Sequence, residues 1–532
     1  MIAPPGALPA RTQVLISGGG PVGLATAVEL GQRGIDCVVV EPRAQVSHAR
    51  PRCKTVNVRT MEHLRRWGLA GRLRAAAPLP VSWSQDAVFC TALTGRELSR
   101  FRGVLGLAPD GDRFPETGQQ APQYVLEELL REAVGELPAC TLATGRRVIS
   151  LQQDHAGAEV LVGGDGGEPS AVAADYVVGC DGPRSTVREQ IGAAYLGEHA
   201  LRPNFGMVFR APQLAGLVRH GPAVHYWIVN DLAPALMGPL DLTGTWWIIA
   251  FGVSREDGDR DPHRIICGAA GRPVAAAVLS TDPWTARMQL AGRLRAGRVF
   301  LAGDAAHLNP PFGGHGLNTG IGDAVDLGWK LAAVLQGWGG QGLLDSYEAE
   351  RRPIQQRVIA EATRNMSVLA PELMSAELDD DGPRGEQARA AAHQRIQEAK
   401  RAEFFALDLV LDVTLDHSPV VVTGGPGRAS GALRPGARLP HAWLAPGRSL
   451  YDELGSGLSL LLLSAADPSG VLQAARARSV PVTVVDLSRS ALGARYGAQA
   501  ALVRPDQYVA WCGSLHQVSA TALIDRVRGA PG

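Results

Sequence analysis

The sequence predicts an α/β protein that carries a second, mainly antiparallel sheet. Three observations lead to this fold class. The first 200 residues alternate short apolar strands with helical patterns, residues 200–290 are rich in aromatic and β-branched residues between turns, and an apolar strand at 299–304 returns to the first pattern. Alternating strands and helices are typical of a parallel sheet covered by helices, whereas closely spaced strands joined by turns are typical of an antiparallel sheet.

A glycine-rich turn follows the first strand. An apolar strand at 13–16 leads to Gly18, Gly20 and Gly23, and the next apolar strand ends at Glu41. Gly18 allows a sharp turn, Gly20 lets the backbone approach a pyrophosphate, and Gly23 lets the helix pack closely on the strand. The helix N-terminus offers N–H groups to phosphates, and Glu41 can accept hydrogen bonds from ribose hydroxyls. The pattern predicts a dinucleotide site, leaves NAD and FAD both open, and also occurs for packing alone.

Composition excludes several classes of protein. The 532 residues carry 52 Lys and Arg against 52 Asp and Glu, a formal net charge of zero, which argues against binding nucleic acid or an anionic membrane through bulk charge. The seven cysteines are odd in number and form no C-x-x-C pair, so we expect neither a disulfide framework nor a metal site. We find no signal at the N-terminus and no apolar run that could span a bilayer, and we expect a cytoplasmic protein.

Helices and strands can be assigned along the first two thirds of the chain. Apolar spacing predicts amphipathic helices at 58–76 and 123–134. A buried strand at 175–179 ends in Asp181, and the strand at 299–304 ends in a Gly–Asp pair. A glycine-rich loop follows, and then a long helix from about Asp323.

The last third changes in character twice. Residues 343–415 are predicted to be helical, and a boundary falls at 423–436, which is rich in Gly, Pro and Arg. Apolar strands at 459–463, 480–485 and 499–503 then alternate with helical segments. We therefore expect a small separate α/β domain at the C-terminus.

Three segments far apart in the sequence together indicate a family. They are the glycine turn with Glu41, the run Cys180–Arg188 (CDGPRSTVR), and the run Gly303–Gly320 (GDAAHLNPPFGGHGLNTG). In combination they resemble the class A flavoprotein monooxygenases, the group of p-hydroxybenzoate hydroxylase and phenol hydroxylase. Within that group the chain is most similar to the aromatic polyketide hydroxylases of actinobacterial antibiotic pathways.

This resemblance implies a reaction and a domain order. It implies FAD as cofactor, NADPH or NADH and O2 as co-substrates, and hydroxylation of a phenolic, polycyclic or polyketide-type small molecule through a flavin C4a-hydroperoxide. A discontinuous Rossmann-like FAD domain with a helical extension is expected at 1–200 and 290–420. A substrate-binding sheet is expected at 200–290, with contributions from about 80–120. A homodimer or larger homo-oligomer is a further expectation.

The C-terminal segment resembles the thioredoxin-like domain of phenol hydroxylase. The matching residues are the run Arg434–Leu444 and the run Val503–Asp506 within 430–532. The segment has no C-x-x-C, so it cannot exchange dithiols. We expect a structural role for it.

The resemblance also implies which residues hold FAD. Asp304 is expected at the ribityl hydroxyls, and the loop Pro311–Asn318 is expected under the isoalloxazine ring. Arg52 and Gln123 are expected near the cofactor, Val148 at the adenine through its backbone, and Asp181 at both FAD and the pyridine nucleotide. The full set is Gly18, Gly20, Pro21, Val22, Gly23, Glu41, Pro42, Arg52, Gln123, Val148, Asp181, Asp304, Pro311, Gly316, Leu317 and Asn318.

Structural alternatives exist for several of these residues. Asp181 and Asp304 could each cap a following helix, and Arg52 and Gln123 could be ordinary exposed polar residues. The family often has Arg or Lys directly after the acid, where this chain has Pro42.

Two histidines lie in the flavin-loop motif. His315 stands where glutamine is usual in the family, and we expect it to face solvent. His307 follows the family pattern, and we expect it to fix the loop rather than to carry a proton.

No catalytic acid or base is evident from the sequence. The aromatic content of 200–290 suits a planar substrate, and Tyr226 and Trp247 are our candidates for lining the pocket. Only half of the residues on a strand can face a pocket. His225 is a candidate base for a phenol, with a surface or core position as its alternative.

Two other functions stay open. A Baeyer–Villiger or ring-modifying flavin oxygenase could use the same scaffold. A flavin-binding protein without catalytic activity is the second alternative, although the intact loop 311–318 argues against it.

Overall fold

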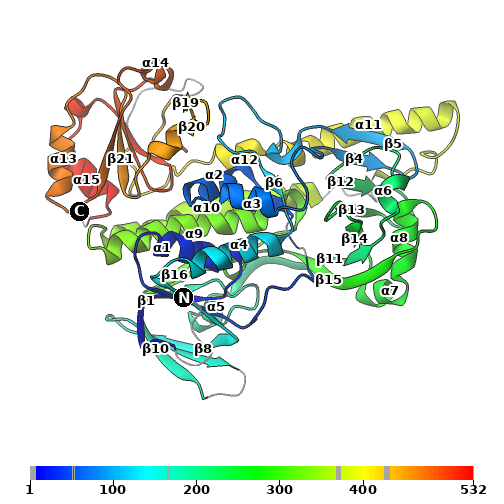
Figure 1. Cartoon of the computed structure of the whole chain (residues 1–532), viewed down its shortest axis with the longest axis horizontal. Coiled ribbons are helices and arrows are strands. Elements are labelled where there is room, and N and C mark those ends of the chain that lie inside the picture. The colour runs from blue at the N-terminus through cyan, green and yellow to red at the C-terminus, as the bar shows by residue number, and fades with distance from the viewer. Residues whose placement is uncertain are drawn as a thin grey trace.

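Two sheets, a bundle of long helices and a C-terminal domain make up the molecule (Figure 1). The computed structural model describes residues 8–50, 52, 54–164, 168–366, 373–423 and 432–530. Helices α9 (His315–Leu335) and α10 (Gln341–Met366) run through the centre, between the first sheet and the C-terminal domain.

The first sheet is the predicted parallel one. Its main path runs in the order β16-β17-β10-β1-β2-β7, and every neighbouring pair from β17 to β7 is parallel. The strands are β1 (Arg11–Ser17), β2 (Cys37–Glu41), β7 (Cys140–Thr144), β10 (Ser170–Gly179), β16 (Arg295–Ala296) and β17 (Val299–Leu301). A meander of β8 (Arg146–Gln153) and β9 (Ala158–Gly164) joins β10. Helix α1 (Pro21–Gly31) packs against both α4 (Gln123–Gly135) and α9. The first sheet's strands are buried because helices cover them, which explains their uninterrupted apolar sequence.

The second sheet is mainly antiparallel, as predicted. Its order is β18-β15-β11-β14-β13-β12-β4-β5, with one parallel pair between β12 and β4. The strands are β4 (Ala87–Cys90), β5 (Glu97–Phe101), β11 (Tyr195–Arg210), β12 (His225–Ile228), β13 (Ala235–Pro239), β14 (Thr245–Phe251), β15 (Ala277–Ala291) and β18 (His307–Leu308). Short helices α6 (Leu214–Leu217), α7 (Arg255–Arg260) and α8 (Pro262–Ala270) lie between its strands in sequence. Strands β11 and β15 are long and connect this sheet with the region of the first sheet (Figure 1).

Several helices differ from their predicted bounds. The helix expected at 58–76 is two helices, α2 (Val58–Arg66) and α3 (Ala70–Ala76), because Gly68 has a φ of +76° and ends the first. Helix α9 begins at His315 rather than Asp323, so part of the predicted glycine loop is already helical. The remaining elements here are β3 (Thr55–Val56), β6 (Gln119–Gln120), α5 (Thr186–Gln190), α11 (Pro383–Phe404) and α12 (Leu407–Leu411).

The C-terminal domain has a mixed sheet in the order β22-β21-β23-β24. A parallel pair, β21 with β22, is followed by an antiparallel hairpin of β23 and β24, as in a thioredoxin-like domain. Its elements are β19 (Trp443–Ala445), β20 (Arg448–Ser449), β21 (Leu458–Leu462), α13 (Ser469–Arg476), β22 (Val482–Asp486), α14 (Leu492–Tyr496), β23 (Ala500–Val503), β24 (Val509–Gly513) and α15 (Ala520–Val527). Most of the expected boundary at 423–436 lies outside the described residues.

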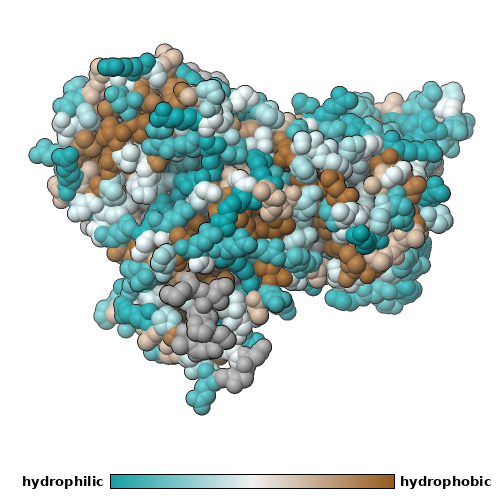
Figure 2. Space-filling model, in the orientation of Figure 1, coloured by the Kyte–Doolittle hydropathy of each residue, from teal (hydrophilic) through white to brown (hydrophobic). Residues whose placement is uncertain are grey.

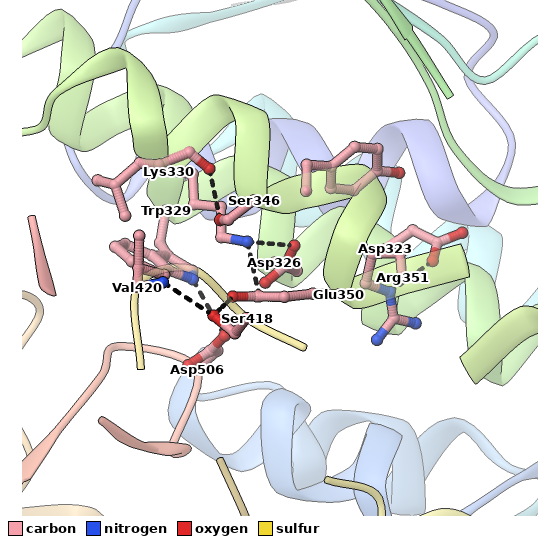
Figure 3. Close-up of polar contacts among 12 residues, drawn as sticks. Asp323, Asp326, Trp329, Lys330, Ser346, Glu350, Arg351, Ser418, Val420 and Asp506 are labelled. Carbon is pink, nitrogen blue, oxygen red and sulfur yellow. Dashed lines mark hydrogen bonds and ion pairs between the residues drawn. The ribbon is translucent and has the colours of Figure 1, made fainter. Parts of the chain in front are cut away.

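A buried ionic cluster joins this domain to the central helices (Figure 3). Arg504 donates to both oxygens of Glu350, at 2.8 and 2.9 Å, and to Asp326 at 2.9 Å. Lys330 donates to Asp326 at 2.9 Å and to Glu350 at 2.7 Å. Asp506 accepts from Arg504 and from the indole of Trp329 at 3.1 Å. The side chains of this cluster are almost completely buried, so removal of one partner would leave charge without compensation.

The described residues contain no disulfide bond. The six cysteines described there are all unpaired, and no group of three or more potential metal ligands occurs among them. None of the helices described is both long and apolar enough to cross a bilayer. The face shown in Figure 2 mixes hydrophilic and hydrophobic residues.

Candidate active site

The glycine turn forms a cradle at the carboxyl edge of the first sheet. Gly18 has a φ of +104°, and a Cβ there would lie 2.3 Å from the carbonyl oxygen of Cys180. A Cβ at Gly23 would lie 1.9 Å from the carbonyl oxygen of Gly18. At Gly20, by contrast, a Cβ would meet no atom within 4 Å. Gly18 and Gly23 therefore serve packing, while Gly20 leaves space open toward the cavity.

The N-terminus of α1 faces this open space without a side-chain cap. Within the described residues no side chain bonds to its first N–H groups, and its first turn contains no acid. Pro21 occupies the first helical position, where a missing N–H costs nothing. Such a terminus is suited to bind an anionic group.

Glu41 is already engaged by its neighbours. It accepts from the backbone N–H of Gly19 at 2.8 Å, and from the backbone and side chain of Arg43 at 2.9 and 2.7 Å. Arg43 reaches on to Glu127 at 2.9 Å. The arginine one position later than the family pattern thus bridges two acids at the edge of the cavity.

A cavity of about 490 Å³ extends from this cradle. It brings together residues from β1, β2, α1, α4, β8 and the ends of β10 and β17. Of the predicted cofactor residues, its lining contains Gly18, Gly20, Pro21, Val22, Glu41, Pro42, Arg52, Gln123, Val148, Asp181, Asp304 and Leu317. Residues separated by up to about three hundred positions in the sequence therefore surround one space.

Asp181 caps the start of α5 with one carboxylate oxygen and leaves the other without a partner in the described part of the chain. One carboxylate oxygen accepts from the backbone N–H of Val187 at 3.2 Å, at the start of α5. The other oxygen is buried and has no hydrogen-bond partner among the described residues. Burial raises the pKa of Asp181, and hydrogen bonds from Ser185 and Val187 oppose that rise. The free oxygen is available to a hydroxyl of a bound molecule.

Asp304 points into the space rather than capping a helix. Its side chain is exposed and lines the cavity, and Asp304 lies inside the turn Gly303–Ala305, for which no side-chain cap is found among the described residues. Burial among protein atoms raises the pKa of Asp304, while His307 and Arg52 oppose this. Its backbone carbonyl accepts from the hydroxyl of Tyr195.

A second cavity, of about 570 Å³, adjoins the first. The two share Arg52, Pro183, Arg184 and Asp304 in their linings. The second cavity is otherwise walled by β11, β14 and β15 of the antiparallel sheet, and it includes Pro311 of the flavin-loop motif. A molecule in this space would therefore lie next to Asp304, at one end of the first cavity.

Comparison with known proteins identifies the family of this two-cavity site. Residues 11–362 match the model described as FAD binding domain, and residues 432–531 match the model described as aromatic-ring hydroxylase, C-terminal. The chain belongs to the FAD-dependent aromatic-ring hydroxylases. It is therefore an FAD-dependent monooxygenase of that family.

Individual relatives agree over nearly the whole chain. A putative polyketide hydroxylase of Streptomyces halstedii is 34% identical over 94% of this chain and 93% of its own length. The rebeccamycin biosynthetic enzyme RebC with reduced flavin has a TM-score of 0.90 at 36% identity, covering 98% of this chain and 100% of RebC. Aklavinone-11 hydroxylase in complex with FAD and aklavinone has a TM-score of 0.82 at 29% identity, covering 98% and 99%. These three relatives are named as a polyketide hydroxylase, an enzyme of rebeccamycin biosynthesis and a hydroxylase of aklavinone.

The first cavity has the features that FAD requires. The open space at Gly20 and the uncapped N-terminus of α1 suit a pyrophosphate, and the unpartnered oxygen of Asp181 suits a hydroxyl. Asp304, at the end of β17, suits the ribityl chain. These residues fit the cofactor of the family.

The loop at residues 311–318 is held in place by hydrogen bonds of Asn318. Asn318 accepts from the backbone N–H of Asn57 at 3.0 Å and from the hydroxyl of Thr60 at 2.8 Å, and it donates to the carbonyls of Thr55 at 2.9 Å and Gly314 at 2.6 Å. Its side chain therefore holds the loop in place. Gly316 and Asn318 lie outside both cavity linings, and the Cβ position of Gly316 is open.

Only one of the two aromatic pocket candidates reaches the second cavity. The register pairs Tyr226 with Met237 and Met237 with Ile248, whereas Trp247 pairs with Gly238. Tyr226 and Trp247 therefore lie on opposite faces of the sheet. Trp247 lines the second cavity.

The prediction that Tyr226 lines the pocket is wrong. Its hydroxyl accepts from the N–H of Ala223 at 2.8 Å and donates to the carbonyl of Gly221 at 2.7 Å in a separate core. The side chain is 1% exposed. Tyr226 is thus a satisfied core residue.

His225 packs among protein side chains. Its ring packs edge-on against Trp247, with ring centres 5.7 Å apart, and it is absent from the second cavity's lining. Burial, and then the charge of Lys54, lowers the pKa of His225 to about 3. The structural alternative for His225 is the one observed.

Both histidines of the flavin-loop motif are buried. The prediction that His315 faces solvent is wrong, because it is 5% exposed and burial lowers its pKa to about 4. His307 lies 2.9 Å from Asp323 and is buried, which is consistent with the expected role in fixing the loop.

Sequence reasoning missed the cations of the second cavity. Lys54, Arg184 and Arg287 all contribute to its lining. Lys54 could have been singled out from the sequence, because lysine is rare in this chain: only three of the 52 basic residues are lysines. The other two, Lys330 and Lys400, are fully buried.

Proposed function

We propose that this enzyme hydroxylates a planar phenolic, multi-ring small molecule of secondary metabolism, with NADPH or NADH as reductant and O2 as oxygen source. The second cavity is the observation that supports this proposal most directly. It adjoins the first cavity at Asp304, and Trp247 and Trp284 of the antiparallel sheet line it. Indole side chains present broad flat surfaces to aromatic rings. A cavity of about 570 Å³ is large enough for a multi-ring ligand.

The chain's own residues have separate tasks in this scheme. Gly20 and the start of α1 would hold the pyrophosphate of FAD, Glu41 a ribose, and Asp304 the ribityl chain. When bound, FAD supplies the electron transfer from NAD(P)H and the activation of O2. Pro311, in the wall of the second cavity, helps to enclose the space between the cofactor and the substrate, and exclusion of water there favours transfer of oxygen over its loss.

The residues that line the second cavity would orient the substrate. Trp247 comes from β14 and Trp284 from β15, so both are held by strands of the sheet. Rigid elements hold a substrate more accurately than loops do. The position attacked on the ring follows from how these walls seat the substrate.

Isotope labelling tests the proposal. The FAD-loaded enzyme is incubated with NADPH or NADH and a panel of polycyclic phenols under 18O2, and products are analysed by mass spectrometry and NMR. We expect one labelled oxygen as a new phenolic hydroxyl; incubation in H218O under 16O2 is the control and should give no label. A labelled lactone or ester would replace hydroxylation by Baeyer–Villiger insertion. Nucleotide consumption without labelled product from any phenol would contradict the proposal.

A further inference from the structure

Four residues line both cavities, namely Arg52, Pro183, Arg184 and Asp304. We call these four residues the neck. They come from separate segments, since Pro183 and Arg184 lie between β10 and α5, whereas Asp304 follows β17. A cofactor in the first cavity and a substrate in the second would approach each other at the neck. The relative position of its segments therefore sets the alignment of the two molecules.

Tyr195 holds the segment of the neck that carries Asp304. Its hydroxyl donates to the backbone carbonyl of Asp304. Burial raises the pKa of Tyr195; Arg188 opposes this rise and the charge of Asp304 adds to it. The hydroxyl therefore keeps its proton at neutral pH and remains a hydrogen-bond donor to this carbonyl.

Arg188 on α5 connects Tyr195 with the other segment. Its Cζ atom lies 3.9 Å from the ring centre of Tyr195, and its Nη1 donates to the carbonyl of Pro183 at 3.2 Å. A planar guanidinium can stack on an aromatic ring and donate hydrogen bonds from its edge at the same time. Arg188 is only 6% exposed, so this arrangement is enclosed by protein. Arg188 and Tyr195, which we call the bracket, thus join the backbone at Pro183 to the backbone at Asp304.

The bracket is continuous with a wall of the second cavity. Tyr195 is the first residue of β11, and residues 206–208 of the same strand line that cavity. Strand β15 pairs with β11 on one side and, on the other, with β18, which follows the turn that contains Asp304. The Tyr195 hydroxyl therefore links the strand that walls the substrate space to that turn.

The bracket acts from outside both cavities. Within the described residues, neither Arg188 nor Tyr195 belongs to the lining of either space. A molecule bound in one of them would contact the neck rather than the bracket. Any effect of replacing Tyr195 on such a molecule therefore passes through the neck.

We propose that Tyr195, supported by Arg188, is a positioning residue that fixes the neck and so aligns the substrate with the cofactor. The proposal rests on the proposed function and deepens it. Misplacement of reacting groups by about 1 Å can lower a rate by roughly 100-fold. Nucleotide whose electrons do not reach the product then reduces O2: NAD(P)H, a proton and O2 give NAD(P)+ and H2O2.

Tyr195→Phe tests this role, because it removes the hydroxyl and keeps the ring beside Arg188. The first measurement is the amount of product and of H2O2 per NAD(P)H oxidised, with a phenol that the labelling experiment shows to be hydroxylated. We expect the product fraction to fall at least about twofold and H2O2 to account for the difference.

The second measurement needs no turnover. Binding of 2-naphthol to the oxidised FAD enzyme is followed by the change that it causes in flavin absorbance. In Tyr195→Phe we expect a Kd within about threefold of the wild-type value, because the cavity walls are intact. The change in absorbance at saturation should be smaller by at least about twofold, because the ring lies differently relative to the flavin.

Tyr496→Phe is the matched control. Tyr496 is fully buried in the C-terminal domain, and its hydroxyl donates to the carbonyl of Pro440 at 2.6 Å. Loss of this equivalent hydrogen bond should leave both readouts as in the wild type. Arg188→Lys is a second test variant, which keeps the charge without the planar stack and should reproduce the effects of Tyr195→Phe. Melting temperature and flavin content report folding, and either test variant decides should the other fail to fold.

The outcomes separate this proposal from the proposed function. Unchanged coupling and unchanged absorbance change in folded Tyr195→Phe, or an equal loss in Tyr496→Phe, overturns the role of the bracket while hydroxylation stands. Weaker FAD binding alone, with both readouts unchanged, would limit Tyr195 to holding the cofactor and also overturns it. If no phenol is hydroxylated but the 2-naphthol signal falls in Tyr195→Phe, the bracket is supported and only the proposed reaction is contradicted.

Discussion

Asp323 on α9 accepts a hydrogen bond from His307 at 2.9 Å, and this contact ties the loop that bears Asp304 to the central helices. The same carboxylate oxygen accepts from the backbone N–H of Gly303 at 3.1 Å. Its other oxygen accepts from Arg351 at 2.8 Å. Arg351 comes first among the partners that lower the pKa of Asp323 against the opposing effect of burial. One buried carboxylate thus positions both ends of the Gly303–His307 turn.

Replacing this carboxylate should weaken both folding and FAD retention. Asp323→Asn keeps the shape but leaves Arg351 buried without its counter-charge, so we expect a loss of about 3–5 kcal/mol in the free energy of unfolding. Urea unfolding and FAD retention on gel filtration measure the two effects. Asp345→Asn on α10 is the control, since that side chain is 70% exposed. Equal stability of the two variants would contradict the role of Asp323.

The two glycines of the cradle should respond differently to alanine. Gly18→Ala places a Cβ 2.3 Å from a backbone oxygen at a φ of +104°, so we expect loss of the folded apoprotein. Gly20→Ala meets no protein atom and has a φ of −76°, so the apoprotein should fold normally. Its methyl group would occupy the space of the pyrophosphate and weaken FAD binding about 10-fold or more. Normal FAD affinity in a folded Gly20→Ala protein would contradict this placement.

Asp304→Asn should separate cofactor binding from stability. The pKa of Asp304 is raised by burial, so its folded-state pKa lies above the unfolded value and its charge opposes folding at neutral pH. The neutral amide should therefore leave the apoprotein at least as stable, as measured by its melting temperature. Replacing a carboxylate acceptor at the ribityl hydroxyls by a weaker amide acceptor should weaken FAD binding by about 10-fold in a fluorescence titration. A less stable apoprotein with unchanged FAD affinity would be the opposite of this expectation.

His315 should make stability depend on pH in the acid range. Its folded pKa of about 4 lies below the ordinary 6.5, so the unfolded chain binds the proton more strongly. Stability is then complete above about pH 6.5 and falls by about 1.4 kcal/mol per pH unit down to about pH 4. His315→Gln should flatten this part of the curve, measured as urea unfolding free energy at several pH values. The exposed His516, replaced in the same way, should leave the slope as in the wild type.

Arg504 should be essential for docking the C-terminal domain. Arg504→Met leaves Glu350, Asp326 and Asp506 in a buried cluster with Lys330 as their remaining cation among these residues, and we expect a loss of about 3–5 kcal/mol. Limited proteolysis should then release the domain more readily. Arg478→Met, which breaks a partly exposed pair with Asp525 in the same domain, should cost less than about 1 kcal/mol. Similar losses in the two variants would contradict a special role for the buried cluster.

Local chemistry explains how much of the site was predictable. Gly18, Gly23 and Glu41 lie within one strand–turn–helix–strand unit, whose geometry follows from the spacing of the residues themselves. Asp304 was predictable because a Gly–Asp pair at a strand end belongs to a recognisable motif. The parallel and antiparallel sheets also followed from uninterrupted apolar runs and from aromatic, β-branched strands.

The sheet face on which a side chain lies, and the burial of a loop residue, could not be predicted from such local patterns. Whether Tyr226 or Trp247 faces the cavity depends on the register with β13, and a strand shifted by one residue would exchange the two faces. His315 lies in a glycine-rich loop sequence, yet it is buried because α9 starts there and packs inside the molecule.

The order of residues along the chain, by itself, determined the dinucleotide cradle, the two kinds of sheet and the family, because each depends on short-range spacing. Only the tertiary structure decided which side chains line the second cavity and that Lys54 lies on Trp247. It also decided that Arg504, near the C-terminus, closes a charge cluster with α9 and α10. Those features depend on packing between segments hundreds of residues apart, which no local pattern encodes.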